Sequence, residues 1–312
     1  MSNIILSLNV VLPLFLMIAL GFFLRLKRLL DDYSLTILNN ICFKVFLPVM
    51  LFFNIYSASL DGILNTDLII FAVVSVFIIF SVLCFVIPFI EKDNRKRGVM
   101  VQGLFRSNFI IFGIPISSSL YGEESLGIIS LLIAVIVPIF NALAVISLEM
   151  FRKGRIDFKK IILSIIKNPL IIASALGLFF LFTGIKLPFF FEKTIGDLSK
   201  VATPLILVTL GGYFTFSTVN GHFKQLFITI LGKLLLIPAI FIPIAILLGF
   251  RNAELACLIA LFAAPTAVTS FTMAKQMNGD AELSGHIVVF TSALSIISLF
   301  FWIFILKQMG FM

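Results

Sequence analysis

The residues best suited to chemistry lie at two interruptions of otherwise apolar segments. In the first, Asn108 and Pro115 fall near the middle of the apolar run 98–120. Because proline has no N–H and clashes with the preceding turn, the helical hydrogen-bond ladder must open there. The second lies 150 residues later, where Pro265 stands near the middle of the run 255–275. Two centrally broken spans in corresponding halves of a chain point to a ligand-binding site.

Each interruption offers the start of a half-helix to an anion. A half-helix beginning at Pro115 would carry Ser117 in its first turns, and one beginning at Pro265 would carry Thr266 and Thr269. Their free N–H groups and positive dipole ends suit a carboxylate. The carbonyl groups freed on the other side of each break could hold Na⁺ or water. Two ordinary proline kinks, stabilised by neighbouring helices, are the alternative.

Three further polar residues belong to the same candidate site. Asn108 either contacts a ligand or satisfies freed backbone. Arg106 lies about 12 Å inside its span by helical rise, and either faces a pathway suited to an organic anion or snorkels to the surface. Asn141 either lines the cavity or bonds a neighbouring helix. The predicted substrate-binding residues are therefore Arg106, Asn108, Gly113, Pro115, Ser117, Asn141, Pro265, Thr266 and Thr269.

Four other titratable residues receive no part in this site. Lys44 and Lys200 are interpreted as interfacial anchors. Lys233, within about two turns of the inner end of its span, is predicted to snorkel. His286 is placed at the membrane interface, near the start of the last span.

The composition excludes a soluble domain, since 61% of the residues are hydrophobic, 12% are charged and the mean hydropathy is +1.18. The basic residues fall in short loops, so the net charge of +8 indicates the orientation of the chain in the membrane rather than nucleic-acid binding. The three cysteines show no metal or redox spacing. None of the fifteen acidic residues lies near the centre of a span, which disfavours a buried carboxylate proton relay. No HExxH, P-loop or paired-carboxylate motif occurs, so an intramembrane enzyme is disfavoured and no cofactor is expected beyond a possible Na⁺ coupling ion.

The predicted fold is an all-α integral membrane protein with ten spans. They cover about 5–24, 35–57, 68–90, 98–120, 126–150, 165–184, 199–219, 226–249, 254–275 and 286–307. Fifteen lysines and arginines fall in the connections on one side, whereas only Lys186, Lys193, Arg251 and Lys307 fall on the other. The positive-inside rule then places both termini outside.

The chain also repeats itself. Pro13-Leu14 recurs as Pro169-Leu170, Ala19-Leu20-Gly21 as Ala175-Leu176-Gly177, and Lys44-Val45-x-x-Pro48 as Lys200-Val201-x-x-Pro204, always 156 positions apart. Residues 1–155 and 156–312 then form two five-span repeats, and an odd number of spans inverts one relative to the other. The fourth and ninth spans are the broken, crossing ones.

These motifs resemble those of the auxin efflux carrier family. Asn108, Gly113-Ile114-Pro115 and Tyr121-Gly122 resemble its fourth helix, the stretches 264–268 and 279–282 resemble the ninth helix and following loop of bacterial members, and 43–48 resembles the second helix. The resemblance covers essentially the whole chain. It implies a scaffold from spans 1, 2, 6 and 7, a mobile transport domain from spans 3–5 and 8–10, a crossover at Pro115 and Pro265, a homodimer, and elevator-type or rocking movement of organic anions.

The chain departs from the plant members of that family. It has no long cytoplasmic loop, and Arg106-Ser107 precedes Asn108. By resemblance to bacterial members, malonate or another small carboxylate in the bacterial plasma membrane is expected rather than auxin. A sodium-coupled symporter of the bile-acid-transporter type is the nearest alternative. A membrane sensor or scaffold without transport is the alternative from another class.

Overall fold

Long apolar runs separated by short polar connections fold into helices, because a helix pairs its backbone groups within one segment. The computed structural model describes residues 2–58, 66–122, 124–152 and 158–312. The predicted boundary between the two repeats, at residues 155 and 156, lies outside the described residues, as do parts of the predicted connections.

The first half of the chain consists of helices joined by short turns. They are α1 (Ser2–Leu26), α2 (Asp32–Ile41), the π-helix η1 (Cys42–Phe46), α3 (Leu47–Tyr56), α4 (Thr66–Ile90), α5 (Asn94–Phe105), α6 (Phe109–Tyr121) and α7 (Glu124–Arg152). The second half continues in the same way. Its elements are α8 (Phe158–Ile166), α9 (Pro169–Thr183), α10 (Phe189–Tyr213), the 3-10 helix η2 (Phe216–His222), α11 (Phe223–Leu231), the π-helix η3 (Gly232–Leu236), α12 (Ile237–Leu247), α13 (Asn252–Ala263), α14 (Thr269–Gln276) and α15 (Ala281–Gln308).

Seven helical stretches among the described residues are long and apolar enough to cross a membrane. They are Leu8–Leu26, Asp32–Tyr56, Thr66–Ile90, Ser125–Arg152, Phe189–Tyr213, Phe216–Leu247 and Ala281–Gln308. Shorter apolar helices cover Phe109–Tyr121, Pro169–Thr183 and Asn252–Ala263. The prediction of an all-helical membrane protein is therefore confirmed in this general form.

The predicted bounds of the seventh span are wrong. The helix begins at Phe189 rather than 199, and it ends at Tyr213 rather than 219. Its first turns therefore include Glu192 and Asp197, which the predicted span 199–219 left in the preceding loop. Asp197 and Lys200 instead pair one turn apart on an exposed helix face, with 2.9 Å between Oδ1 and Nζ.

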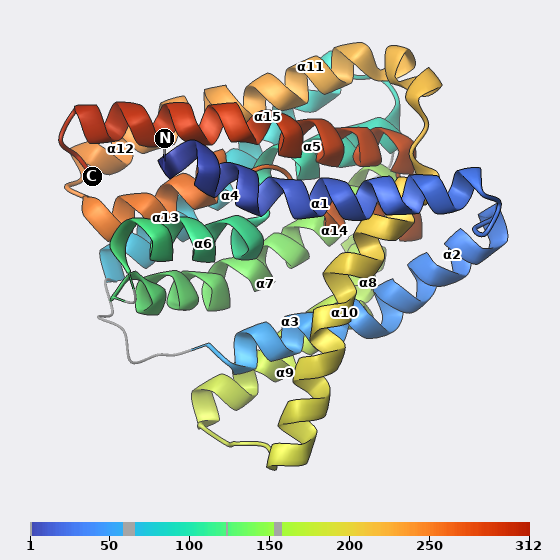
Figure 1. The fold of residues 1–312 in the computed structure, drawn as a ribbon, viewed down its shortest axis with the longest axis horizontal. Coiled ribbons are helices and arrows are strands. Elements are labelled where there is room, and N and C mark those ends of the chain that lie inside the picture. The colour runs from blue at the N-terminus through green and yellow to red at the C-terminus, as the bar shows by residue number, and fades with distance from the viewer. Residues whose placement is uncertain (1, 59–65, 123, 153–157) are drawn as a thin grey trace.

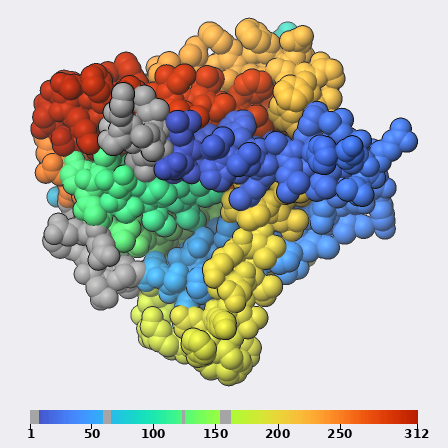
Figure 2. All heavy atoms as spheres, viewed as in Figure 1, coloured from blue at the N-terminus to red at the C-terminus, as the bar shows by residue number. Residues whose placement is uncertain are grey.

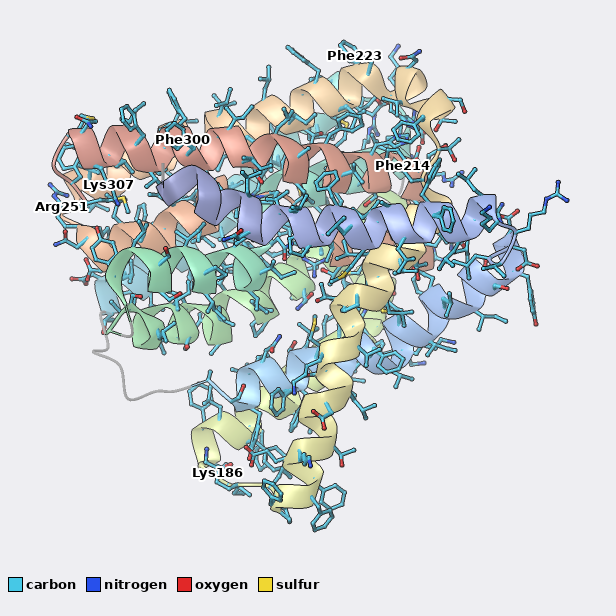
Figure 3. The ribbon with its side chains drawn as sticks, viewed as in Figure 1. Lys186, Phe214, Phe223, Arg251, Phe300 and Lys307 are labelled. Atoms are coloured by element: carbon cyan, nitrogen blue, oxygen red, sulfur yellow. The ribbon has the colours of Figure 1, made fainter. Side chains whose placement is uncertain are left out.

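The helices pack in two groups. In one, α1 packs across α10, α3 packs on α9, and α10 contacts α3; in the other, α5 contacts α7, α6 contacts α13, and α15 contacts α11 and α14 (Figure 1). The two groups touch where α1 packs on α15 and α6, and Figure 2 shows α1 crossing this face between α15 and α10. Arg251 and Lys307, both predicted to lie outside, are at the end of the bundle where α1 begins and α15 ends, whereas Phe214 and Phe223 lie at the opposite end (Figure 3).

Both predicted broken spans are interrupted. The first is divided into α5 and α6 by Arg106–Asn108, and the second into α13 and α14 by residues 264–268. Two further helical stretches stay continuous but contain a π-helix that ends two residues before a proline, η1 before Pro48 and η3 before Pro238. Because each proline lacks an N–H, the preceding turn is free to widen.

The turn that leads into α5 is fixed by Glu91. Burial acts to raise the pKa of its carboxyl, but hydrogen bonds from the Gln225 side chain and from the Asp93 N–H outweigh it and hold that pKa below its usual value. Arg97 Nε also donates to the Glu91 carbonyl, at 2.7 Å. These contacts tie the start of α5 to α11.

Candidate functional site

The two interrupted segments cross one another and pair through their backbones. Asn108 N–H donates to the carbonyl of Pro265 over 2.7 Å, and Ala267 N–H donates to that of Arg106 over 3.3 Å. These two bonds make a single antiparallel β-bridge centred on Ser107 and Thr266. Backbone groups freed by each break are therefore satisfied by the other break, as the interior of a membrane protein requires.

Pro265 explains why α13 ends where it does. Ala264, the residue before it, is extended with φ −65° and ψ 152°, as proline imposes on its neighbour. Pro265 also leaves the Leu261 carbonyl without a helical donor, and the Ser107 hydroxyl donates to that carbonyl instead. In return, the Thr266 hydroxyl donates to the Gly103 carbonyl over 2.6 Å. These two hydroxyl–carbonyl bonds, Ser107 to Leu261 and Thr266 to Gly103, link the two broken segments and are called the clasp below.

The prediction that a half-helix begins at Pro115 is wrong. Pro115 lies in the interior of α6, which begins at Phe109, and the break lies at Arg106–Asn108. No proline marks this break. It opens because the Asn108 N–H pairs with Pro265 from the other segment rather than with its own helix. Ser117 consequently lies well inside α6, buried, with Oγ 3.2 Å from the sulfur of Cys257.

Replacing Thr266 with valine should lower the free energy of unfolding by about 1–3 kcal/mol, because the buried Gly103 carbonyl would lose its hydroxyl donor. Thermal unfolding in detergent would measure the change. Thr194→Val, on an exposed helix face, is the matched control and should leave the melting temperature unchanged. Equal stability of Thr266→Val and wild type would contradict the clasp.

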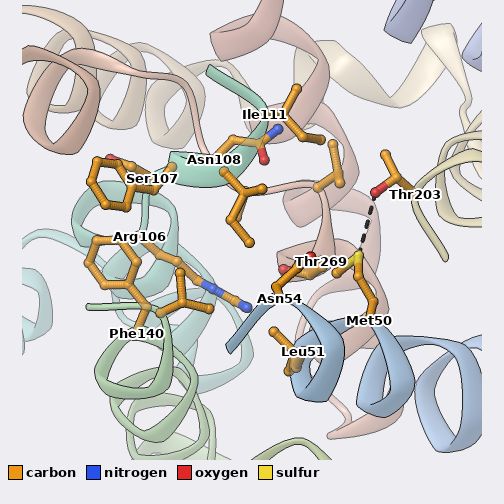
Figure 4. Close-up of a pocket in the computed structure, with 15 residues that line it drawn as sticks. Met50, Leu51, Asn54, Arg106, Ser107, Asn108, Ile111, Phe140, Thr203 and Thr269 are labelled. Carbon is orange, nitrogen blue, oxygen red and sulfur yellow. Dashed lines mark hydrogen bonds between the residues drawn. The ribbon is translucent and has the colours of Figure 1, made fainter. Parts of the chain in front are cut away.

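A cavity of about 60 Å³ lies beside the crossing, between the two groups of helices (Figure 4). That volume holds several water molecules or a group such as a carboxylate. The lining residues come from α3, α6, α7, α10, α14 and both interruptions: Met50, Leu51, Asn54, Arg106, Ser107, Asn108, Phe109, Ile110, Ile111, Val137, Phe140, Thr203, Ala267, Val268 and Thr269. The first residues of both half-helices, α6 and α14, thus face one cavity.

Arg106 is the charged residue of this cavity. Its side chain is 4% exposed, so it faces the interior rather than snorkelling to the surface. The guanidinium donates to Asn141 Oδ1 at 2.5 Å and to the Met273 sulfur at 2.8 Å, and it extends toward α3 (Figure 4). Both partners are neutral, and none of the described residues lining the cavity is acidic. The positive charge is therefore available to a bound anion.

Asn108 supplies a second donor. Its side chain is buried, and its Nδ2 has no hydrogen-bond partner among the described residues. A buried amide N–H without an acceptor is costly, which indicates a group that a ligand or water completes. Thr269, at the start of α14, also lines the cavity.

The other predicted site residues lie near the crossing without lining the cavity. Gly113 packs closely against Ile129, since a Cβ there would approach the Ile129 Cδ1 to 3.0 Å. Asn141 supports Arg106 and donates to the Val137 carbonyl, while Pro265 and Thr266 belong to the clasp.

Sequence reasoning missed several residues of the site. Met50, Asn54 and Thr203 line the cavity from the other group of helices. A polar Asn54 inside an apolar span was the available signal. Lys233 is also not at the surface: it is 1% exposed, and its Nζ donates to Ser107 Oγ over 2.5 Å. The snorkelling prediction for Lys233 is wrong.

His286 is buried within the protein. Its Nε2 lies 3.2 Å from the Thr215 carbonyl and its Nδ1 lies 3.3 Å from Nδ1 of His222, which in turn approaches Asp280. Lys44 and Lys200 are both exposed, as interfacial anchors would be.

Comparison with known proteins supports a role in transport. The profile of a family described as membrane transport protein matches residues 6–303. An uncharacterized transporter of Methanocaldococcus jannaschii is 24% identical over 306 residues, which cover 96% of this chain and 98% of that protein. An uncharacterized transporter of Methanothermobacter thermautotrophicus is also 24% identical, over 95% of this chain and 97% of its own length.

Proposed function

The chain belongs to the membrane transport protein family, and from that premise we propose that it is a secondary carrier for a small organic anion such as a carboxylate. The single observation that carries the proposal is the cavity at the crossing. It combines the uncompensated guanidinium of Arg106, the unpartnered amide of Asn108 and the starts of two half-helices. All of these favour negative charge.

The carboxylate would sit between Arg106 and the first turns of α6 and α14. One oxygen would accept from the guanidinium and the other from Asn108 Nδ2, with Thr269 as a further hydroxyl donor. Charge-assisted hydrogen bonds of this kind are the strong ones in proteins. The remainder of the anion would lie against α3, near Leu51 and Asn54.

Transport would proceed as an elevator-type movement between two bodies. The scaffold would comprise spans 1, 2, 6 and 7, which correspond to α1, α2–α3, α9 and α10, and the transport domain the remaining spans. The packing of α1 on α10, of α3 on α9 and of α10 on α3 supports this grouping. The cavity draws residues from both bodies, as alternating access at a crossover requires.

The same proposal includes ten spans in two inverted repeats, both termini outside the plasma membrane, and a homodimer. The reciprocal clasp supports the repeats, since Ser107 serves the α13 carbonyl of Leu261 and Thr266 serves the α5 carbonyl of Gly103. Orientation rests on the positive-inside pattern, and the homodimer rests on the family resemblance alone.

The sodium-coupled alternative finds less support at the crossing itself. It needs freed carbonyl groups as ion ligands, yet those of Gly103, Arg106, Leu261 and Pro265 each accept a hydrogen bond from the protein. A scaffold without a ligand would leave the unpartnered Nδ2 of Asn108 and the buried charge of Arg106 without a purpose.

The test is a thermal-shift screen of the purified protein with acetate, lactate, malonate and succinate, each with Na⁺ and with choline. A carboxylate at about 100 times its Kd should stabilise the folded state by about 2.7 kcal/mol. Asn108→Ala should weaken that binding about tenfold by removing one buried donor. The exposed Asn220→Ala is the matched control and should bind like wild type. A shift that survives Asn108→Ala undiminished would place the site elsewhere.

A further inference from the structure

A second buried cation stands at the crossing, outside the cavity lining. Lys233 belongs to the π-helix η3, where the Ile237 N–H donates to the carbonyl of Gly232 five residues earlier. Pro238 leaves the Leu234 carbonyl without a helical donor, and the indole N–H of Trp302 on α15 donates to it at 3.0 Å. The widened turn is therefore held in place from outside, and π-bulges of this kind often occur at functional sites.

The geometry brings this turn against the end of α5. A Cβ on Gly232 would approach the Leu104 Cδ2 to 2.4 Å, so η3 packs there through its glycine. Lys233, the next residue, points its ammonium into the crossing and donates to Ser107 Oγ. Ser107 in turn donates to the Leu261 carbonyl, the group that Pro265 deprives of its helical partner. The Ser107 hydroxyl therefore connects the Lys233 ammonium to the Leu261 carbonyl, which lacks its helical donor.

A helix break in a transporter commonly binds a coupling cation with such carbonyls. Here the ammonium group of Lys233, which is part of the protein, provides the positive charge. Arg106 precedes Ser107 in the chain and Lys233 donates to the Ser107 hydroxyl, and neither cation has an acidic partner among its hydrogen bonds within the described residues. An anion bound in the cavity would therefore feel two fixed positive charges and would require no metal cation beside it.

We propose that Lys233 is a built-in counter-cation of the anion site, positioned by η3 and Ser107 at the place where a coupling cation would otherwise bind. The inference rests on the proposed carrier function, because it assigns Lys233 to the same site. Lys233 acts through Ser107 and through its charge, so it is a positioning and specificity residue rather than a direct ligand.

The experiment measures the Kd of whichever of acetate, lactate, malonate and succinate binds tightest, by calorimetry of the purified protein with Na⁺ or choline as the sole small cation. Wild type should bind equally in both salts. Lys233→Gln, which retains a hydrogen-bond donor to Ser107, should bind about tenfold more weakly, because a full charge near the anion is lost. Lys233→Arg, which retains the charge, should bind within about threefold of wild type.

Lys44→Gln is the matched control. Lys44 also lies in a π-helix before a proline, but its side chain is exposed, so its loss should leave the Kd unchanged. Unchanged binding by Lys233→Gln, or wild-type binding that requires Na⁺, would overturn the proposal.

A measurement without any carboxylate separates this inference from the carrier function. If Lys233 occupies the cation's place, sodium chloride should raise the melting temperature of wild type no more than choline chloride does. A saturable Na⁺-specific rise in melting temperature would refute the role of Lys233, whatever the substrate. Failure of all four carboxylates to bind wild type would refute the carboxylate carrier, while the sodium comparison would still test Lys233.

Discussion

Replacing Arg106 with glutamine should weaken carboxylate binding by about two orders of magnitude. The guanidinium is buried, lines the cavity and is held by the neutral groups of Asn141 and Met273, so its charge is left for the ligand. A direct charge–charge contact near 4 Å is worth about 4 kcal/mol at an effective dielectric constant of 20, and about 2.7 kcal/mol corresponds to a hundredfold change in Kd. Calorimetric titration with the carboxylates named above would measure the loss.

Without ligand, Arg106→Gln should not lower the stability of the protein. An uncompensated buried charge is costly, and glutamine could still donate to Asn141 while removing that charge. We therefore expect the melting temperature without ligand to stay level or rise, as is common where a binding site is less stable than it could be. A purely structural arginine would instead lower the melting temperature when lost.

Two variants complete this test. Arg106→Lys retains the charge but not the planar fork of donors, so an intermediate loss of about tenfold is expected. Arg25→Gln removes an arginine from an exposed ion pair with Asp32, and it should leave the Kd unchanged. Wild-type affinity in Arg106→Gln would contradict the anion site.

The position of the site could be predicted from sequence because one of its two breaks is encoded locally. Pro265 ends α13, because proline has no N–H to continue the helix. The partner break was placed at the wrong residue, since Pro115 is accommodated inside α6 while Asn108 leaves its helix to pair with Pro265. Sequence periodicity cannot reveal a break that a distant segment induces.

Some polar residues of the candidate site were also predictable from the sequence, and others were not. Arg106, Asn108 and Thr269 were predicted as site residues, and all three line the cavity. Lys233 was misread because a lysine two turns from a span's end usually reaches water, and only the π-turn before Pro238 together with the nearby Ser107 directs it inward. Residues such as Asn54 enter through packing between helices far apart in the sequence, which no local pattern encodes.

Replacing Gly211 with alanine should destabilise the protein by more than about 3 kcal/mol, because overpacking against backbone is relieved only by moving a helix. A Cβ at Gly211 would lie 1.9 Å from the carbonyl oxygen of Ile18, and a Cβ at Gly21 would lie equally close to that of Val208. Neither obstacle is a flexible side chain, so α1 and α10 would have to separate. Close backbone approach through glycine is how membrane helices associate tightly.

A thiol-reactive dye would report this unfolding through Cys42 and Cys257, which are buried in the native fold. Gly221→Ala, where a Cβ would meet open space, is the control and should melt like wild type. Gly177→Ala should be destabilising but less so, since a Cβ there would lie 2.9 Å from the Ile55 side chain. Equal stability of Gly211→Ala and wild type would show that α1 and α10 can slide apart.

Whether α1 and α10 can separate bears on the proposed elevator-type movement. Gly21 and Gly177 are 156 positions apart, and each lies where a helix of one half crosses a helix of the other, α1 on α10 and α9 on α3. Two equivalent glycine crossings would lock α1, α3, α9 and α10 into one rigid body. An elevator-type carrier needs such a body, because the cavity changes sides only if the part that carries Arg106 and Asn108 moves against something that does not.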